Sequence, residues 1–256
     1  MPVNQDQTGK GSVSVAPGSV RRETKDEPKP KETLMPTPTR GKKIMTAVVT
    51  GQHPFHVPAF HQLFRSMPEI DAYIQHLEDF VSDAGNVRNE YEVVVFYNFH
   101  QTTPGNEQGW WERATKEALD KLGETPQGIF VLHHGLLACA QWPLWAEIVG
   151  IPDRKFQFDM SQHLRVEIAD PAHPITHGLA AWEMVDETYL MNDAGPGSHV
   201  LLTTNHPRSL KTLAWTRQSR AARVFCLQSG HDERAYENPS FRRIVSRGIQ
   251  WLAGRI

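Results

Sequence analysis

The sequence contains only two cysteines, Cys139 and Cys226, and no apolar run of the length that crosses a membrane. Both cysteines lie in apolar surroundings and do not make a disulfide framework, so we predict two buried free thiols. A spanning helix needs about 18 apolar residues, and the first residues lack the apolar segment of a secretory signal. A cytoplasmic protein without membrane contact is therefore expected.

Neither sign of charge dominates the chain. The 27 lysines and arginines nearly balance the 29 aspartates and glutamates, which leaves a formal net charge of -2. No basic stripe is present, and nucleic-acid binding usually requires one. Nucleic acid is therefore excluded as an expected partner.

Aliphatic residues are sparse over residues 1–43, where Pro, Lys, Glu, Thr, Ser and Gly are frequent. Such a segment cannot bury enough apolar surface to offset the entropy lost on ordering. We predict a disordered tail at 1–43 and one α/β domain at 44–256.

Familiar catalytic signatures are missing as well. The sequence has no Gly-x-Ser-x-Gly elbow and no His-Glu-x-x-His pair. Amidotransferases and cysteine hydrolases of α/β architecture carry a thiol on the turn after a buried strand, and this sequence carries His133 there. Cys139 falls within the next helical segment and Cys226 in mid-strand, so thiol-based acyl transfer is disfavoured.

Apolar runs alternate with helical patterns in the first half of the domain. The region between the first run and Ser66 shows no clean period. Strand–helix alternation implies a parallel sheet with right-handed crossovers. The predicted strands are 43–50, 92–97 and 128–132, and the predicted helices are 68–85, 109–122 and 136–149.

The second half has short, interrupted strands, which suggest an antiparallel or mixed extension of that sheet. A final buried strand at 224–227 precedes a helix that Asn238 caps and Pro239 begins. The predicted fold is α/β, with a mostly parallel sheet and an antiparallel extension. The strands predicted in the extension are 164–168, 184–189, 200–204 and 212–216.

The sequence contains 13 histidines, and several of them lie where predicted strands end. His133 and His134 follow one strand, and the pair His231-Asp232 follows the last one. Ligands of open α/β sheets bind at the carboxyl ends of the strands, so these side chains are candidates for a site. The alternative is a purely structural role: one of the two residues His133 and His134 would only pack in the core, and Asp232 would only cap a helix.

The loop after the first strand offers His53 and His56. Together with the other loops it could supply three imidazoles and a carboxylate, a set that suits zinc or a similar divalent ion. We take His56, His133 and His231 as the candidate ligands.

Two further features are candidate sugar contacts. Asp186, Glu187 and Tyr189 lie on one predicted strand, and carboxylates beside an aromatic ring can accept sugar hydroxyls or act as a base. Their ordinary alternative is a solvated strand edge. Trp215 is a stacking platform or, more often for such a residue, part of the core.

Three stretches carry a resemblance to the ThuA-like (trehalose utilisation) family: 128–150 (GIFVLHHGLLACAQWPLWAEIVG), 170–190 (DPAHPITHGLAAWEMVDETYL) and 223–254. The resemblance implies a flavodoxin-like, class I glutamine amidotransferase-like three-layer sandwich without the catalytic cysteine. It places site residues at His133, at the Gly230-His231-Asp232 turn and at the Asp186-Glu187-x-Tyr189 segment. In the first loop His53, His56 and His61 compete, and we favour His56.

The leading functional hypothesis is an enzyme acting on a trehalose-like disaccharide or its 3-keto derivative, with or without a divalent metal. The alternative is a non-catalytic sugar-binding or regulatory module, and the oligomeric state, including a homo-oligomer, stays open. An amidotransferase-like partner protein is disfavoured by the missing thiol. The catalytic candidates are His133, His231, Asp232 and Glu187, and the substrate-binding candidates are His56, His134, Asp186, Tyr189 and Trp215.

Overall fold

The computed structural model describes residues 42–105 and 109–256. The tail predicted at 1–43 therefore lies, except for its last two residues, outside the described residues. Within them, nine strands form a sheet of order β2-β1-β3-β4-β9-β8-β7-β5-β6.

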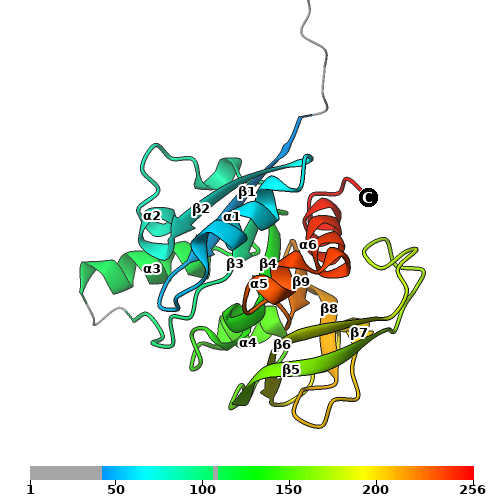
Figure 1. Ribbon diagram of the computed structural model, residues 1–256. Coiled ribbons are helices and arrows are strands. Elements are labelled where there is room, and N and C mark those ends of the chain that lie inside the picture. The colour runs from blue at the N-terminus through cyan, green and yellow to red at the C-terminus, as the bar shows by residue number, and fades with distance from the viewer. Residues whose placement is uncertain (1–41, 106–108) are drawn as a thin grey trace, which may run out of the picture. The chain divides into compact units, whose positions relative to one another are not determined.

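The first five strands of that order are parallel, and they form the core of the sheet (Figure 1). The other four continue it by antiparallel pairing. The predicted fold class is confirmed. The parallel strands are β2 (Ile70–His76), β1 (Ile44–Thr50), β3 (Val93–Phe96), β4 (Gly128–Leu132) and β9 (Ala222–Leu227). The antiparallel strands are β8 (Thr212–Ser219), β7 (His199–Thr203), β5 (Gln157–Ile168) and β6 (Trp182–Leu190).

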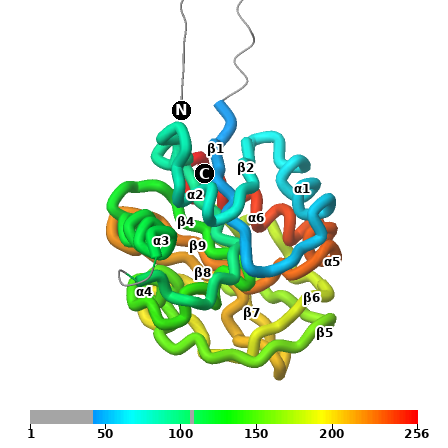
Figure 2. Tube along the Cα trace, turned by 90° about the vertical axis from the view of Figure 1, so that its left-hand side faces the viewer, coloured from blue at the N-terminus to red at the C-terminus, as the bar shows by residue number. Residues whose placement is uncertain are grey.

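Helices cover both faces of the parallel strands (Figure 2). One face packs against α1 (Val57–Arg65), α5 (Glu233–Glu237) and α6 (Pro239–Leu252). The other packs against α2 (Leu77–Ser82), α3 (Trp110–Asp120) and α4 (Pro143–Val149). Two short 3-10 helices, η1 (Arg88–Glu90) and η2 (His133–Leu137), complete the elements. Alternate residues of each buried strand enter the two cores, as the period of two requires.

Three parts of the predicted pattern of elements differ from the structure. The helix predicted over 136–149 is limited to α4 (Pro143–Val149), and η2 and a turn that contains Cys139 precede it. Residues 70–76 form β2 instead of the start of a helix, because Ile70, Ala72 and Ile74 alternate with polar residues and pair with β1. The region without a clean period contains α1, whose N-terminus is capped by the His56 ring and whose Phe60 enters the core. Histidine is not among the preferred N-cap residues, so little in the sequence indicated that a helix begins here.

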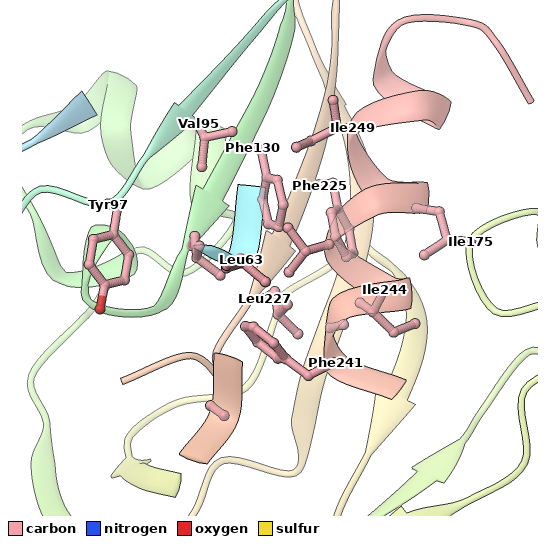
Figure 3. Packing of buried hydrophobic residues seen from close by; sticks show 14 of the residues in the cluster. Leu63, Val95, Tyr97, Phe130, Ile175, Phe225, Leu227, Phe241, Ile244 and Ile249 are labelled. Carbon is pink, nitrogen blue, oxygen red and sulfur yellow. The ribbon is translucent and has the colours of Figure 1, made fainter. Parts of the chain in front are cut away.

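Close packing beneath α6 explains one glycine of that helix. Figure 3 shows Phe130 and Phe225 next to the helix, and their ring centroids are 4.7 Å apart. A Cβ on Gly248 would lie 2.5 Å from the Phe225 ring. The helix can therefore approach the sheet only with glycine at this position.

Gly135 lies where η2 crosses β3, and a Cβ there would come within 2.3 Å of the Phe96 carbonyl oxygen. We predict that Gly135→Ala lowers the free energy of unfolding by about 1–3 kcal/mol, because backbone must shift to admit the methyl group. Urea denaturation measures this. Gly109→Ala, where the nearest atom is the flexible end of Glu112, is the control. Gly109 is the N-cap of α3, so this change should lower stability by no more than about 1 kcal/mol. Equal stability of the two variants would contradict the prediction.

Candidate functional site

His133 follows β4 directly and has φ of 50°, the left-handed region that non-glycine residues seldom adopt. The ring is fully buried. Its Nδ1 lies 2.6 Å from the Gln228 carbonyl oxygen, which can only accept, so Nδ1 carries a proton. Nε2 is thereby left to face Tyr189 Oη at 2.8 Å and Glu187 Oε2 at 3.0 Å. Strained backbone of this kind is often retained at functional sites.

Glu187 reaches this histidine from β6, in the antiparallel extension. Burial by itself would raise the pKa of its carboxyl, but its hydrogen bond with His133 and the electrostatic effect of His133 and His231 outweigh burial and hold the pKa below its ordinary value. The group is therefore an ionised carboxylate at neutral pH. Its main-chain carbonyl accepts a hydrogen bond from the Gln228 side chain, which ties β6 to the end of β9.

His231 is the third member, on the turn that follows β9. Its Nε2 lies 4.0 Å from Glu187 Oε2, and its Nδ1 lies 3.8 Å from Asp232 Oδ2. The side chain is 14% exposed, whereas His133 is not exposed at all, so His231 is the member that solvent and a ligand can reach. Three elements that are distant in sequence thus place two imidazoles and a carboxylate face to face.

Asp186 anchors the His231 turn. Its carboxylate accepts hydrogen bonds from the main-chain N–H groups of Gly230 at 2.7 Å, His231 at 3.0 Å and Glu187 at 2.9 Å. The side chain is completely buried, and burial raises its pKa despite His133 and these hydrogen bonds. Asp186 was predicted to bind substrate, but in the structure it is inaccessible and positions the turn.

Two tyrosines that the sequence analysis did not identify hold the same turn from the other side. The Tyr97 hydroxyl lies 3.1 Å from the carbonyl oxygens of both Gly230 and His231, and the Tyr236 hydroxyl donates to the latter at 2.9 Å. The two hydroxyls are 2.6 Å apart. The available signal was Tyr97 itself, a polar aromatic residue directly after a buried strand.

His134 is buried beside the cluster. Its Nε2 donates to the Tyr97 carbonyl at 2.7 Å, and its Nδ1 has no partner within the described part of the chain. Burial, together with the charges of His133 and His53, lowers its pKa strongly, so the ring is neutral. It packs at 4.2 Å from the Tyr97 ring and does not face His231 directly.

The first loop contributes His53 rather than His56. His53 lies over His134 with ring centroids 4.3 Å apart and meets His231 edge-on at 5.5 Å. Burial lowers the pKa of His53, although its hydrogen bond with the Pro54 carbonyl opposes this. His56 is exposed and caps α1, where its Nδ1 accepts from the Ala59 N–H, so it is not a ligand candidate in this structure.

Two other predicted residues have different surroundings from those expected. Trp215 is fully buried, and its Nε1 donates to the Val149 carbonyl, so it offers no stacking surface. Asp232 caps α5 and pairs with Arg234; although burial would raise its pKa, these contacts lower it. Asp232 thus both caps a helix and lies next to His231.

His133, Glu187 and His231 fit a divalent cation. Within the described residues, one ligand atom from each lies within 4.8 Å of the others. Two imidazole nitrogens and one carboxylate oxygen are a donor set found at zinc sites that keep a position open for substrate. The hydrogen bond from His133 Nδ1 to a main-chain carbonyl is the usual outer contact of a metal-binding histidine.

The structure also has hollows that lie away from His133, Glu187 and His231. One of about 570 Å³ is at the opposite, amino ends of β3 and β4, where Glu92 and Gln127 line it. It holds no comparable group of titratable side chains, so the cluster is the better candidate site. No helix among residues 42–105 and 109–256 is both long and apolar enough to cross a membrane.

The sheet order and the turn after β4 define an α/β protein with a class I glutamine amidotransferase-like fold. Its structural neighbours include a protein described as ThuA-like from Parabacteroides merdae, with 21% identity, TM-score 0.61 and coverage of 83% of this chain and 90% of that one. A ThuA-like protein from Bacteroides uniformis has 17% identity, TM-score 0.64 and coverage of 83% and 92%. A protein from Thermoplasma acidophilum, described as part of a GMP synthase, has 10% identity, TM-score 0.52 and coverage of 84% and 97%.

The family model ThuA, described as trehalose utilisation, matches residues 45–252, and the chain belongs to this family. The resemblance found in the sequence is thereby confirmed. No curated protein matches the chain significantly.

Proposed function

We propose that this protein is an enzyme acting on a small sugar, a trehalose-like disaccharide or its 3-keto derivative, at the site formed by His133, Glu187 and His231. Family membership links the chain to trehalose utilisation in general. The finer assignment, to a reaction at this site, rests on the geometry of the three side chains.

The single observation that carries the proposal is the convergence of these groups at the carboxyl ends of β4 and β9. Burying ionisable groups is costly, and a fold that needed only stability could fill this space with apolar side chains. Here His133 has no exposure and Glu187 is nearly buried, yet both face His231, which is accessible. Ionisable groups held together in this way are typical of catalytic sites.

His133, Glu187 and His231 would each have a different role in a reaction on a keto-sugar. Removal of a proton from the carbon next to a carbonyl needs a base within reach of that carbon. His231 suits this role, because it is the accessible member of the three and its Nε2 lies 4.0 Å from the Glu187 carboxylate. Glu187 remains ionised and stabilises a proton gained by either imidazole. His133, held at Nδ1 by the Gln228 carbonyl, keeps its Nε2 directed at Glu187.

In the alternative arrangement, a divalent ion bound by His133, Glu187 and His231 would polarise the sugar carbonyl oxygen, and His231 would then be a ligand and not the base. The protein's contribution is then to present three ligand atoms and to fix the His133 ring. Asp186 contributes indirectly, because it holds the turn that carries His231.

We expect the purified protein to contain a divalent metal in near-stoichiometric amount, and the double variant His133→Ala/His231→Ala to contain less than about a tenth of it, because only one of the three ligands remains. Plasma mass spectrometry measures both. His173→Ala/His199→Ala, which removes two histidines that pack together elsewhere, is the matched control and should keep the wild-type content. Equal metal in the double variant and the wild type would place the metal elsewhere.

Turnover tests the proposal directly. Trehalose and 3-keto-trehalose are each incubated with the protein and followed by NMR and mass spectrometry. Conversion of either sugar supports the enzyme. Thermal stabilisation by a sugar that stays chemically unchanged would instead favour the sugar-binding module.

A further inference from the structure

A second concave site lies behind the loops that build the histidine cluster. It is a cavity of about 230 Å³ between those loops and α3. Pockets for drug-sized ligands measure roughly 300–1,000 Å³, so this one suits a single small ring. Its lining consists of Gln52, Leu77, His100, Gln101, Thr102, Pro104, Trp111, Glu112, Thr115 and Cys139.

In each of two loops, one residue lines the cavity and its neighbour in sequence packs beside the histidine cluster. After β1, Gln52 lines the cavity, while the His53 ring packs at a tilt against His134 beside the cluster. After β3, His100 lines the cavity, while the Phe99 ring lies 5.8 Å from that of His134. The cavity and the cluster therefore share their walls but present different side chains.

The cavity contains a polar group that the protein leaves without a partner. Thr115 is 5% exposed, and its hydroxyl is buried with no hydrogen bond within the described residues. A buried hydroxyl without a partner costs free energy, and a ligand hydroxyl would remove that cost. Since Thr115 lines the cavity, a molecule bound there is positioned to supply it.

His100 adds a donor. Burial lowers its pKa to about 4, so the ring is neutral at pH 7. The Asn98 side-chain amide donates to Nδ1 at 3.3 Å, which leaves the ring proton on Nε2. The lining also includes Glu112, whose carboxylate is an acceptor, and Trp111, which carries an indole ring.

We propose that this cavity binds a neutral, ring-sized polyhydroxylated molecule such as a monosaccharide unit. The lining offers donors, acceptors and an indole surface, the combination that sugars use, because their hydroxyls need both kinds of partner and their C–H faces pack on aromatic rings. Among the described residues the lining includes Glu112 and neither lysine nor arginine, so a sugar phosphate would be repelled. The assignment goes beyond the proposed function and holds whether or not the histidine cluster is catalytic.

The test is saturation-transfer NMR and calorimetric titration of the full chain with D-glucose, with glucose 6-phosphate as the charged comparison. We expect D-glucose to bind the wild type and His231→Ala equally. Thr115→Val should weaken binding about tenfold, because one hydrogen bond to the sugar is lost. Glu112→Gln should weaken it by a similar factor, because a hydrogen bond to a charged acceptor becomes one to a neutral amide oxygen. Glucose 6-phosphate should bind at least about tenfold more weakly than D-glucose, because the phosphate faces a carboxylate.

Three outcomes would overturn the proposal. In the first, D-glucose does not bind the wild type. In the second, His231→Ala loses D-glucose binding while Glu112→Gln retains it. In the third, glucose 6-phosphate binds more tightly than D-glucose. The second outcome would move the sugar to the histidine cluster and leave the proposed function intact. Circular dichroism of both cavity variants confirms that they fold.

Discussion

His231→Ala is expected to reduce turnover of the sugar substrate by about 10²–10⁴-fold, the usual contribution of a positioned acid or base. The imidazole is the accessible member of the cluster, and alanine removes both its proton-accepting nitrogen and a ligand atom. The fold should tolerate the change, because the anchoring hydrogen bond to Asp186 comes from the main-chain N–H of His231. NMR conversion rates and urea denaturation measure the two effects.

The matched control for that experiment is His199→Ala. His199 is more than half exposed and pairs with Asp170 on the surface, away from β4 and β9. Its replacement should leave turnover within about twofold of the wild type, since exposed ion pairs contribute little. Unchanged turnover in His231→Ala would refute the assigned role.

The second large effect is expected for Asp186→Ala. The variant leaves three main-chain N–H groups, two of them buried and one partly buried, without their acceptor, and a buried group costs about 1–3 kcal/mol when unsatisfied. Relief of the buried charge returns part of that loss, so we expect the free energy of unfolding to fall by about 2–4 kcal/mol. Turnover should fall as well, because the turn that carries His231 loses its anchor.

Asp159→Ala is the control for stability. Asp159 pairs with Arg208 at the surface, and its removal should cost about 1 kcal/mol or less. Urea denaturation of both variants, with turnover measured on the folded fraction, separates the two effects. If Asp186→Ala matched Asp159→Ala in stability, the three hydrogen bonds would not be the anchor described above.

The parallel core could be predicted from the sequence because its strands are short apolar runs bounded by turn residues, as at Gly128–Leu132 and Val224–Leu227. Length and β-branching separate such runs from helices. The region 51–76 could not be predicted, because its helix begins with a histidine cap and β2 has a period-two pattern that also fits spacing of four. Short segments of this kind are decided by the tertiary partner.

The candidate site was likewise predictable from the sequence only in part. His133, His231 and Glu187 were identifiable, since each follows or lies on a strand directed to one edge of the sheet. Which first-loop histidine joins them was not, because the left-handed Gln52 turns His53 inward and leaves His56 to cap a helix. The burial of Trp215 depends on β8 pairing with both of its neighbours, β7 and β9, which the local sequence does not reveal.

The place of β6 in the sheet has a consequence for how the protein reaches its working state. This strand is last in the sheet order, yet it supplies Asp186, Glu187 and Tyr189 to the ends of β4 and β9. These contacts are separate from the pairing of β4 with β9 in the parallel core. A chain with a complete parallel core but an undocked extension would have its histidines in place without their carboxylates. Competence at this site therefore reports that the antiparallel extension has docked, and not merely that the parallel core is folded.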